Sequence, residues 1–211
     1  MALTTEQRIR RAAIKLFADK GFHGTGIRDL AQAAKISSAS LYHYMGTKED
    51  LLADVMRECL ARLLRAARGL TGEDPRDRLA GLVALHVLTH ATQPAETRVV
   101  DHEVHVLSPT VRRRIVSLRD EYELLWTETI SDGIRAGVFQ DAEPVVTRLA
   151  LLDMCNGVTR WYSPRGPLSL EQLATHYARL ALRMLGGPEN DFSFPVQQAR
   201  EVVSTVWKRT L

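Results

Sequence analysis

The stretch Ile36–Lys48, ISSASLYHYMGTK, decides the fold of the N-terminal part of this chain. Ser37 is a predicted N-cap, and Ile36 and Leu41 around it have the spacing of a hydrophobic staple. A second cap is predicted at Thr47, which leaves room for about two helical turns between the caps. Leu41 is the single large aliphatic anchor, so the rest of this helix is small, polar and aromatic. Such a face predicts a recognition helix, because hydroxyl, imidazole and phenol groups reach base edges and phosphates.

Two further helices are predicted before this stretch. Over residues 4–20 the apolar side chains recur at helical spacing, and Gly21 is predicted to end the helix. A short second helix is predicted from Ile27, and Lys35 connects it to the recognition helix. Two short helices joined by a tight turn, the second with exposed polar groups, are typical of a helix-turn-helix.

The composition is that of an ordinary globular protein, with 211 residues, 45% of them apolar and 25% charged. Residues 1–48 hold eight Lys or Arg against three acids, a net of +5, so the remainder carries −2 of the total +3. This favours a polyanionic partner for the N-terminal quarter, although a solvated basic face gives the same count. Cys59 and Cys155 are predicted to be buried free thiols. With no signal core and no long uncharged apolar run, we expect a soluble cytoplasmic protein without a membrane partner.

Several segments of the first fifty residues together resemble the DNA-binding domain of TetR-family repressors. They read AAIKLFADKGF at 12–22, TGIRDLA at 25–31, SLYHY at 40–44 and KEDLL at 48–52. The resemblance implies DNA contacts from the second helix, from the recognition helix and from the start of the fourth helix. The residues at these places are Thr25 and Arg28, then Ser38, Ala39, Ser40, Tyr42, His43 and Tyr44, then Lys48.

The same resemblance implies different roles along the recognition helix. The small residues at 38–40 and His43 would face the major groove, while Tyr42, Tyr44 and Lys48 would hold phosphates. Lys48 begins a helix, where its charge and the backbone N–H groups both favour an anion. For the two tyrosines, packing in the core is the alternative.

The rest of the chain is predicted to be helical, beginning with a long apolar seam from Lys48 to about Gly69. Residues 143–162 are apolar on nearly every side, which predicts burial by their own core and by a second subunit. The resemblance implies that this helix and helix 168–185 form a dimer interface. We therefore expect an all-α fold with a helix-turn-helix DNA-binding domain at 1–48, a ligand-binding and dimerisation domain at 49–211, and an additional tail helix within 188–211.

Polar residues in this apolar body predict a ligand cavity between helices. Asn156 interrupts an apolar helix and needs hydrogen-bond partners, either from a ligand or from a carbonyl across the core. The segment RWYSPRGPL at 160–168 resembles TetR-type repressors of steroid and fatty-acid breakdown that sense acyl-CoA thioesters. That resemblance implies CoA phosphates near Arg160 or the run 112–114, which is also typical of a solvated face. The candidate ligand residues are His86, His90, His102, His105, Trp126, Leu152, Asn156 and Arg160.

Metal binding is a weaker interpretation of the same histidines. His86 and His90 are four residues apart, and Asp101–His105 is rich in His and acids. Such patches are more often surface or pocket polar groups, so we predict no metal and no cofactor. The sequence also contains no nucleophile elbow, zinc-protease motif or phosphate-binding loop, so we predict that the protein is not an enzyme.

The resulting hypothesis is a homodimeric repressor that binds a palindromic operator in double-stranded DNA. A small hydrophobic ligand, with an acyl-CoA thioester as the candidate, would release it. The alternatives are a metal-sensing regulator of the same fold, or a helical ligand-binding protein that does not read DNA.

Overall fold

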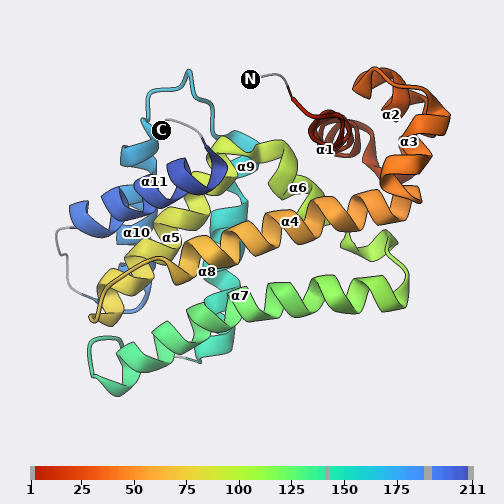
Figure 1. Cartoon of the computed structure of the whole chain (residues 1–211). Helices are drawn as coiled ribbons and strands as arrows, with labels where there is room; N and C mark the ends of the chain where they lie inside the picture. Colours follow the sequence, from red (N-terminus) through yellow and green to blue (C-terminus); the bar gives the residue numbers. More distant parts are fainter. Residues whose placement is uncertain (1–2, 141–142, 188–191, 209–211) are drawn as a thin grey trace. The chain divides into compact units, whose positions relative to one another are not determined.

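The computed structural model describes residues 3–140, 143–187 and 192–208. Within them every regular element is a helix (Figure 1), which confirms the predicted all-α fold. No helix in these ranges is long and apolar enough to cross a membrane. The elements are α1 Thr5–Gly24, α2 Ile27–Ala34, α3 Ser38–Met45, α4 Lys48–Arg68, α5 Pro75–Thr92, α6 Pro94–His102, η1 Val104–Val106, α7 Pro109–Arg135, α8 Pro144–Asn156, α9 Val158–Trp161, α10 Leu170–Met184 and α11 Ser193–Trp207.

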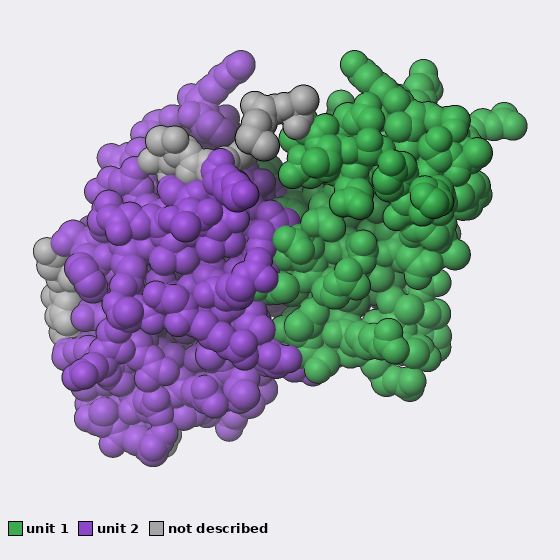
Figure 2. Space-filling model, in the orientation of Figure 1, with its two compact units in different colours: residues 1–61, 94–119 green, residues 62–93, 120–211 purple. Residues whose placement is uncertain are grey.

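The chain divides into two compact units (Figure 2). The first contains residues 1–61 and 94–119, and the second contains residues 62–93 and 120–211. Each has its own cluster of buried apolar side chains. The first unit therefore includes α6, η1 and the start of α7 in addition to the helix-turn-helix. The functional division at residue 48 stays a prediction.

In the first unit, α1 presents a narrow buried stripe that includes Ile9, Ala13 and Phe17. The helical path of α1 is broken at Gly21, whose φ of 72° is a conformation that glycine adopts at little cost. This is the residue at which the sequence predicted the first helix to end. α1 packs against α2 and α6.

The second unit is built around α5, in which every residue from 79 to 91 is buried. α8, α9, α10 and α11 all pack against it. The additional tail helix that the sequence predicted is α11, which packs on the body of its own chain. Residues 188–191 and 209–211 of the predicted tail lie outside the described residues.

The helix predicted over residues 143–162 is interrupted at Gly157, which separates α8 from α9. One side of α8 is buried, as predicted, through Leu151, Leu152 and Cys155. The opposite side is exposed in the single chain. Cys155 and Cys59 are buried free thiols, as predicted, and burial raises the pKa of the Cys155 thiol.

Candidate nucleic-acid interface and ligand site

The recognition helix α3 is held by one cap and a small apolar contact. The Ser37 hydroxyl accepts the N–H of Ser40 at 3.0 Å, which confirms the predicted N-cap. Leu41 and Met45 are its only buried side chains. The remaining residues of α3 are therefore free of the core.

The start of α4 fixes the other end of this segment. The Thr47 hydroxyl accepts the N–H of Asp50 at 3.0 Å, and the Asp50 carboxylate accepts the N–H of Thr47 at 2.9 Å. These two bonds form a capping box at Thr47, where the sequence predicted a cap. The hydrogen bonds from Thr47 hold the pKa of Asp50 below its usual range.

The side of α3 that faces solvent carries the residues predicted to read DNA. Ala39, Ser40 and His43 are exposed and Ser38 is half-buried. Among the described residues, no hydrogen bond or ion pair engages the His43 ring, which meets Tyr44 edge-on at 5.6 Å between ring centroids. This side of α3, residues 38–40 and 42–44, is called the reading face below.

Tyr42 and Tyr44 are 53% and 49% exposed, which argues against their packing in the core. Arg28 on α2 is also exposed, and it forms no ion pair within the described ranges. These three side chains have the reach and the freedom that a phosphate contact needs.

Thr25 does not fit its predicted role. It lies between α1 and α2, it is 1% exposed, and its hydroxyl donates to the carbonyl oxygens of Gly21 at 2.8 Å and Leu16 at 3.1 Å. A buried hydroxyl bonded in this way holds the turn in place and is not presented to DNA. Arg28 is the residue at this end of α2 that reaches solvent.

Lys48 has a structural role that the sequence did not reveal. Its ammonium donates to the carbonyl oxygens of Phe22 and Thr25, both at 2.9 Å, and lies 4.3 Å from the centroid of the Phe22 ring. Lys48 thereby ties the start of α4 to the turn before α2. An ammonium has three donors, so one remains for a phosphate.

The same turn is held by an acid that sequence reasoning missed. The Glu103 carboxylate, between α6 and η1, accepts the N–H of Phe22 at 3.2 Å. Nearby, the Glu49 carboxylate accepts the N–H of Ser108 at 2.7 Å. No local pattern could have revealed the first contact, because its partners are 81 residues apart in the chain.

Part of the predicted ligand set meets in the core of the second unit. His86 Nδ1 lies 3.0 Å from the Tyr122 hydroxyl, and His86 Nε2 lies 2.8 Å from Asn156 Oδ1. The His90 ring stacks on His86 at 4.0 Å, and Trp126 meets His86 edge-on at 5.7 Å. Tyr122 is the member of this cluster that the sequence analysis did not name as a ligand residue.

Within this cluster, both ring nitrogens of His86 have partners from the protein itself. With Asn156 accepting through its oxygen, His86 donates from Nε2 and accepts the Tyr122 hydroxyl proton at Nδ1. Burial raises the pKa of Tyr122, which keeps its phenol a neutral donor. The sequence allowed a ligand or a carbonyl across the core as the partner of Asn156, and the structure supplies neither of these but the His86 ring.

The other predicted ligand residues are placed differently. His102 and His105 are exposed and belong to the first unit, so the structure does not group them with His86 and His90. Leu152 is buried in the second unit, whereas Arg160 on α9 is exposed. The run at 112–114 is exposed on α7. The described part of the chain contains no group of three or more His, Cys, Asp or Glu side chains that could hold a metal ion.

Comparison with known proteins covers both halves of the chain. Residues 9–55 match the bacterial regulatory proteins of the tetR family, and residues 72–185 match the C-terminal domain of tetracyclin-repressor-like proteins. The chain is 30% identical over 174 residues to the HTH-type transcriptional repressor KstR2 of Mycolicibacterium smegmatis, which covers 81% of this chain and 85% of KstR2.

Solved structures show the same fold. The regulator PfmR from Thermus thermophilus has a TM-score of 0.76 and 33% identity, covering 87% of this chain and 100% of PfmR. AibR, solved in complex with isovaleryl coenzyme A and operator DNA, has a TM-score of 0.76 and 25% identity over 84% of this chain and 97% of AibR. The capped reading helix and the two family matches agree, and this chain belongs to the tetR family of bacterial regulators: it is a helix-turn-helix DNA-binding transcriptional repressor and not an enzyme.

Proposed function

We propose that this repressor acts as a homodimer on a palindromic operator, with α3 of each copy in the major groove. The observation that carries this proposal is the reading face, whose side chains are exposed except for the half-buried Ser38. His43 and the small residues at 38–40 read base edges, while Arg28, Tyr42, Tyr44 and Lys48 hold phosphates. Since DNA is its target, we place the protein in the cytoplasm.

The dimer interface is proposed on α8 and α10. Val145, Val146 and Leu149 on α8 are 44%, 62% and 49% exposed, and Leu180 and Met184 on α10 are 45% and 53% exposed. Large apolar side chains gathered on two helices favour an interaction surface. A second copy is the occupant that a two-fold palindrome requires.

The inducer is proposed to be a small hydrophobic ligand bound in the second unit, with an acyl-CoA thioester as the candidate. The similarity to AibR supports this choice, because that protein was solved with isovaleryl coenzyme A and operator DNA. Ligand binding would favour a conformation whose two reading helices no longer match the spacing of the operator half-sites.

A gel-shift titration against the DNA upstream of the protein's own gene tests the DNA proposal. His43→Ala should weaken binding to the operator by about 1–3 kcal/mol and relax its sequence preference. Lys48→Ala should weaken binding to every sequence alike, and Arg65→Ala, an exposed charge on the same helix, serves as its control. If neither His43→Ala nor Lys48→Ala changes binding, α3 is not the reading helix. A protein that binds no DNA at all would favour the alternative of a ligand-binding protein.

Light scattering tests the dimer. Val146→Arg on α8 should yield monomers and lose cooperative operator binding, whereas Leu124→Arg on α7, 52% exposed in the wild type, should remain dimeric. Monomers from both variants would place the interface elsewhere.

Release of operator DNA by isovaleryl-CoA and longer acyl-CoAs, with free CoA as the control, tests the ligand. A ligand present at 100 times its Kd should also stabilise the protein by about 2.7 kcal/mol. Stabilisation by zinc instead of thioesters would support the metal-sensing alternative.

A further inference from the structure

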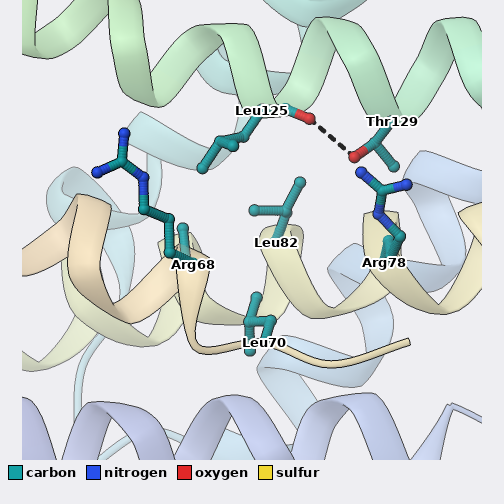
Figure 3. A pocket seen from close by; sticks show the side chains of 7 residues that line it. Arg68, Leu70, Arg78, Leu82, Leu125 and Thr129 are labelled. Atoms are coloured by element: carbon teal, nitrogen blue, oxygen red, sulfur yellow. Dashed lines mark hydrogen bonds between the residues drawn. The ribbon is translucent and has the colours of Figure 1, made fainter. Parts of the chain in front are cut away.

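The second unit contains a pocket of about 260 Å³ that none of the sequence-predicted ligand residues lines. Its walls come from the end of α4, the loop that follows, α5 and α7 (Figure 3). The volume is slightly below the usual range for small-molecule sites, which suits a compact ligand or one end of a longer one. The lining residues are Ala67, Arg68, Leu70, Arg78, Leu82, Leu125 and Thr129.

The floor of this pocket is apolar. Leu82 is buried, and Leu70 and Leu125 are partly buried against the same core cluster. The Thr129 hydroxyl donates to the Leu125 carbonyl oxygen at 2.7 Å, so it offers no donor to a ligand. An apolar ligand body would therefore rest on the leucines.

The charged groups of the lining are two guanidinium groups. Figure 3 shows Arg68 and Arg78 at opposite ends of the pocket, with Leu82 between them. Arg68 Nη2 lies 3.1 Å from the Glu121 carboxylate, and Arg78 Nη1 lies 3.0 Å from that of Asp132. Each guanidinium has five N–H donors, so these single contacts leave donors for an anion.

Both ion pairs are weak, so each arginine can bind a ligand anion beside its acid or in place of it. The side chains of Arg68 and Glu121 are 58% and 47% exposed, and those of Arg78 and Asp132 are 35% and 32% exposed. Ion pairs at this exposure add little stability, because water and salt screen them. A ligand whose apolar chain is buried in the pocket can displace the acid from such an ion pair. Its carboxylate then accepts two parallel N–H bonds from the guanidinium.

We propose that this pocket binds an amphipathic carboxylate of medium chain length. Its chain lies on Leu82 and Leu125, and its carboxylate binds the guanidinium of Arg78 or Arg68. On α5, Leu82 is one turn before His86, so the pocket and the buried histidine cluster share this helix. The binding itself is independent of DNA, whereas any effect on repression rests on the proposed function.

Isothermal titration of the full-length protein with octanoate tests the site, with octanol and the dicarboxylate suberate as comparison probes. Octanoate should bind, and octanol should bind at least about tenfold more weakly because it lacks the charge. Suberate binding more tightly than octanoate would mean that both guanidinium groups are used. No octanoate binding at millimolar concentration, or equal binding of octanol, would overturn the proposal.

Charge variants locate the binding site. Arg78→Gln or Arg68→Gln should weaken octanoate binding by about tenfold. Arg65→Gln, one turn earlier on α4, removes the same charge outside the pocket and should leave the affinity unchanged. Glu121→Gln frees Arg68 and should tighten binding. Octanoate affinity that is unchanged in both Arg68→Gln and Arg78→Gln would place the ligand elsewhere.

A gel-shift titration separates this site from the proposed function. If octanoate binds in the pocket but operator DNA is not released, the pocket is a carboxylate-binding site but not the inducer site. If the protein binds no operator, the proposed function fails while the binding isotherm and its Arg variants still decide the pocket.

Discussion

α3 and α5 use polar residues in opposite ways. In α3 only Leu41 and Met45 are buried, and His43 makes no hydrogen bond within the described part of the chain. In α5 every residue from 79 to 91 is buried, and His86 is bonded through both ring nitrogens. The same residue type is thus left for a partner on one helix and used by the protein's own core on the other.

The difference follows from what each helix is packed against. α5 is covered by several other helices, so a polar group on it is removed from water. Unless it finds a hydrogen-bond partner inside the protein, nothing replaces the bonds to water that it loses. α3 is short and touches the core along one narrow strip, so its polar groups keep water until another molecule replaces it. A histidine in a helix therefore indicates a binding site only after its surroundings are known.

The largest effect that tests this comparison should come from Leu41→Ala. Leu41 is fully buried and is the main anchor of α3. We expect the unfolding free energy to fall by about 2–5 kcal/mol and the amide hydrogens of α3 to exchange faster. Leu85→Ala on α5, also fully buried, should cost a similar amount and leave exchange in α3 unchanged. Equal exchange of α3 in both variants, measured by mass spectrometry, would show that α3 does not depend on this anchor.

The next effect contrasts two histidines. His86→Ala leaves the Tyr122 hydroxyl and the Asn156 amide oxygen without their buried partner, so we expect a loss of about 2–4 kcal/mol. His43→Ala on α3 should change stability by less than about 0.5 kcal/mol. Denaturant unfolding measures both. Similar losses from the two variants would break the contrast between the helices.

A smaller effect is expected from Thr25→Val. Thr25 lies in the first unit, but its hydroxyl behaves like that of Thr89 on α5, which donates to the Leu85 carbonyl oxygen at 2.8 Å. Losing this bond should cost about 1–2 kcal/mol, and Thr25→Ser should recover most of it. Under conditions in which all variants are folded, Thr25→Val and Thr25→Ser should bind DNA with the same affinity, although only the second keeps the hydroxyl. Loss of affinity at unchanged stability would restore the DNA contact that the sequence predicted.

The smallest effect is expected on the stability of the protein at low pH. Thr47 lowers the pKa of Asp50 at the start of α4, and Arg76 lowers that of Asp74, the N-cap of α5. A folded pKa below the unfolded one adds stability above the unfolded value, and this stability is lost as pH falls through the folded value. Asp50→Asn and Asp74→Asn should each reduce the loss of stability below about pH 4. Asp19→Asn, an exposed acid on α1, is the control, and an equal change in it would contradict this assignment.

Some features of the predicted site could be assigned from contacts between residues that are close in the chain. The caps at Ser37 and Thr47 were correct because each joins residues three apart. For Tyr42 and Tyr44 the sequence left packing in the core open, and the structure shows both side chains exposed while Leu41 is buried. The residues of the reading face that the sequence selected are exposed in the structure except for the half-buried Ser38, and their contacts with DNA stay a prediction.

Other assignments needed contacts between distant residues. Thr25 lies in a matching motif, yet its hydroxyl is used by α1. Lys48 binds carbonyl oxygens more than twenty residues earlier in the chain. The eight ligand candidates were grouped by residue type, and they separate because His102 and His105 belong to another unit. The Arg68–Arg78 pocket was not foreseen, because three separate helices and a loop form its walls.

By itself the sequence determined the helices, their caps and the family, because these depend on spacings within one or two turns. Only the tertiary structure decided which polar groups stay free. A hydroxyl, an imidazole or an ammonium has the same chemistry in either place, and whether it binds DNA, a ligand or its own chain depends on the groups that folding brings within about 3 Å.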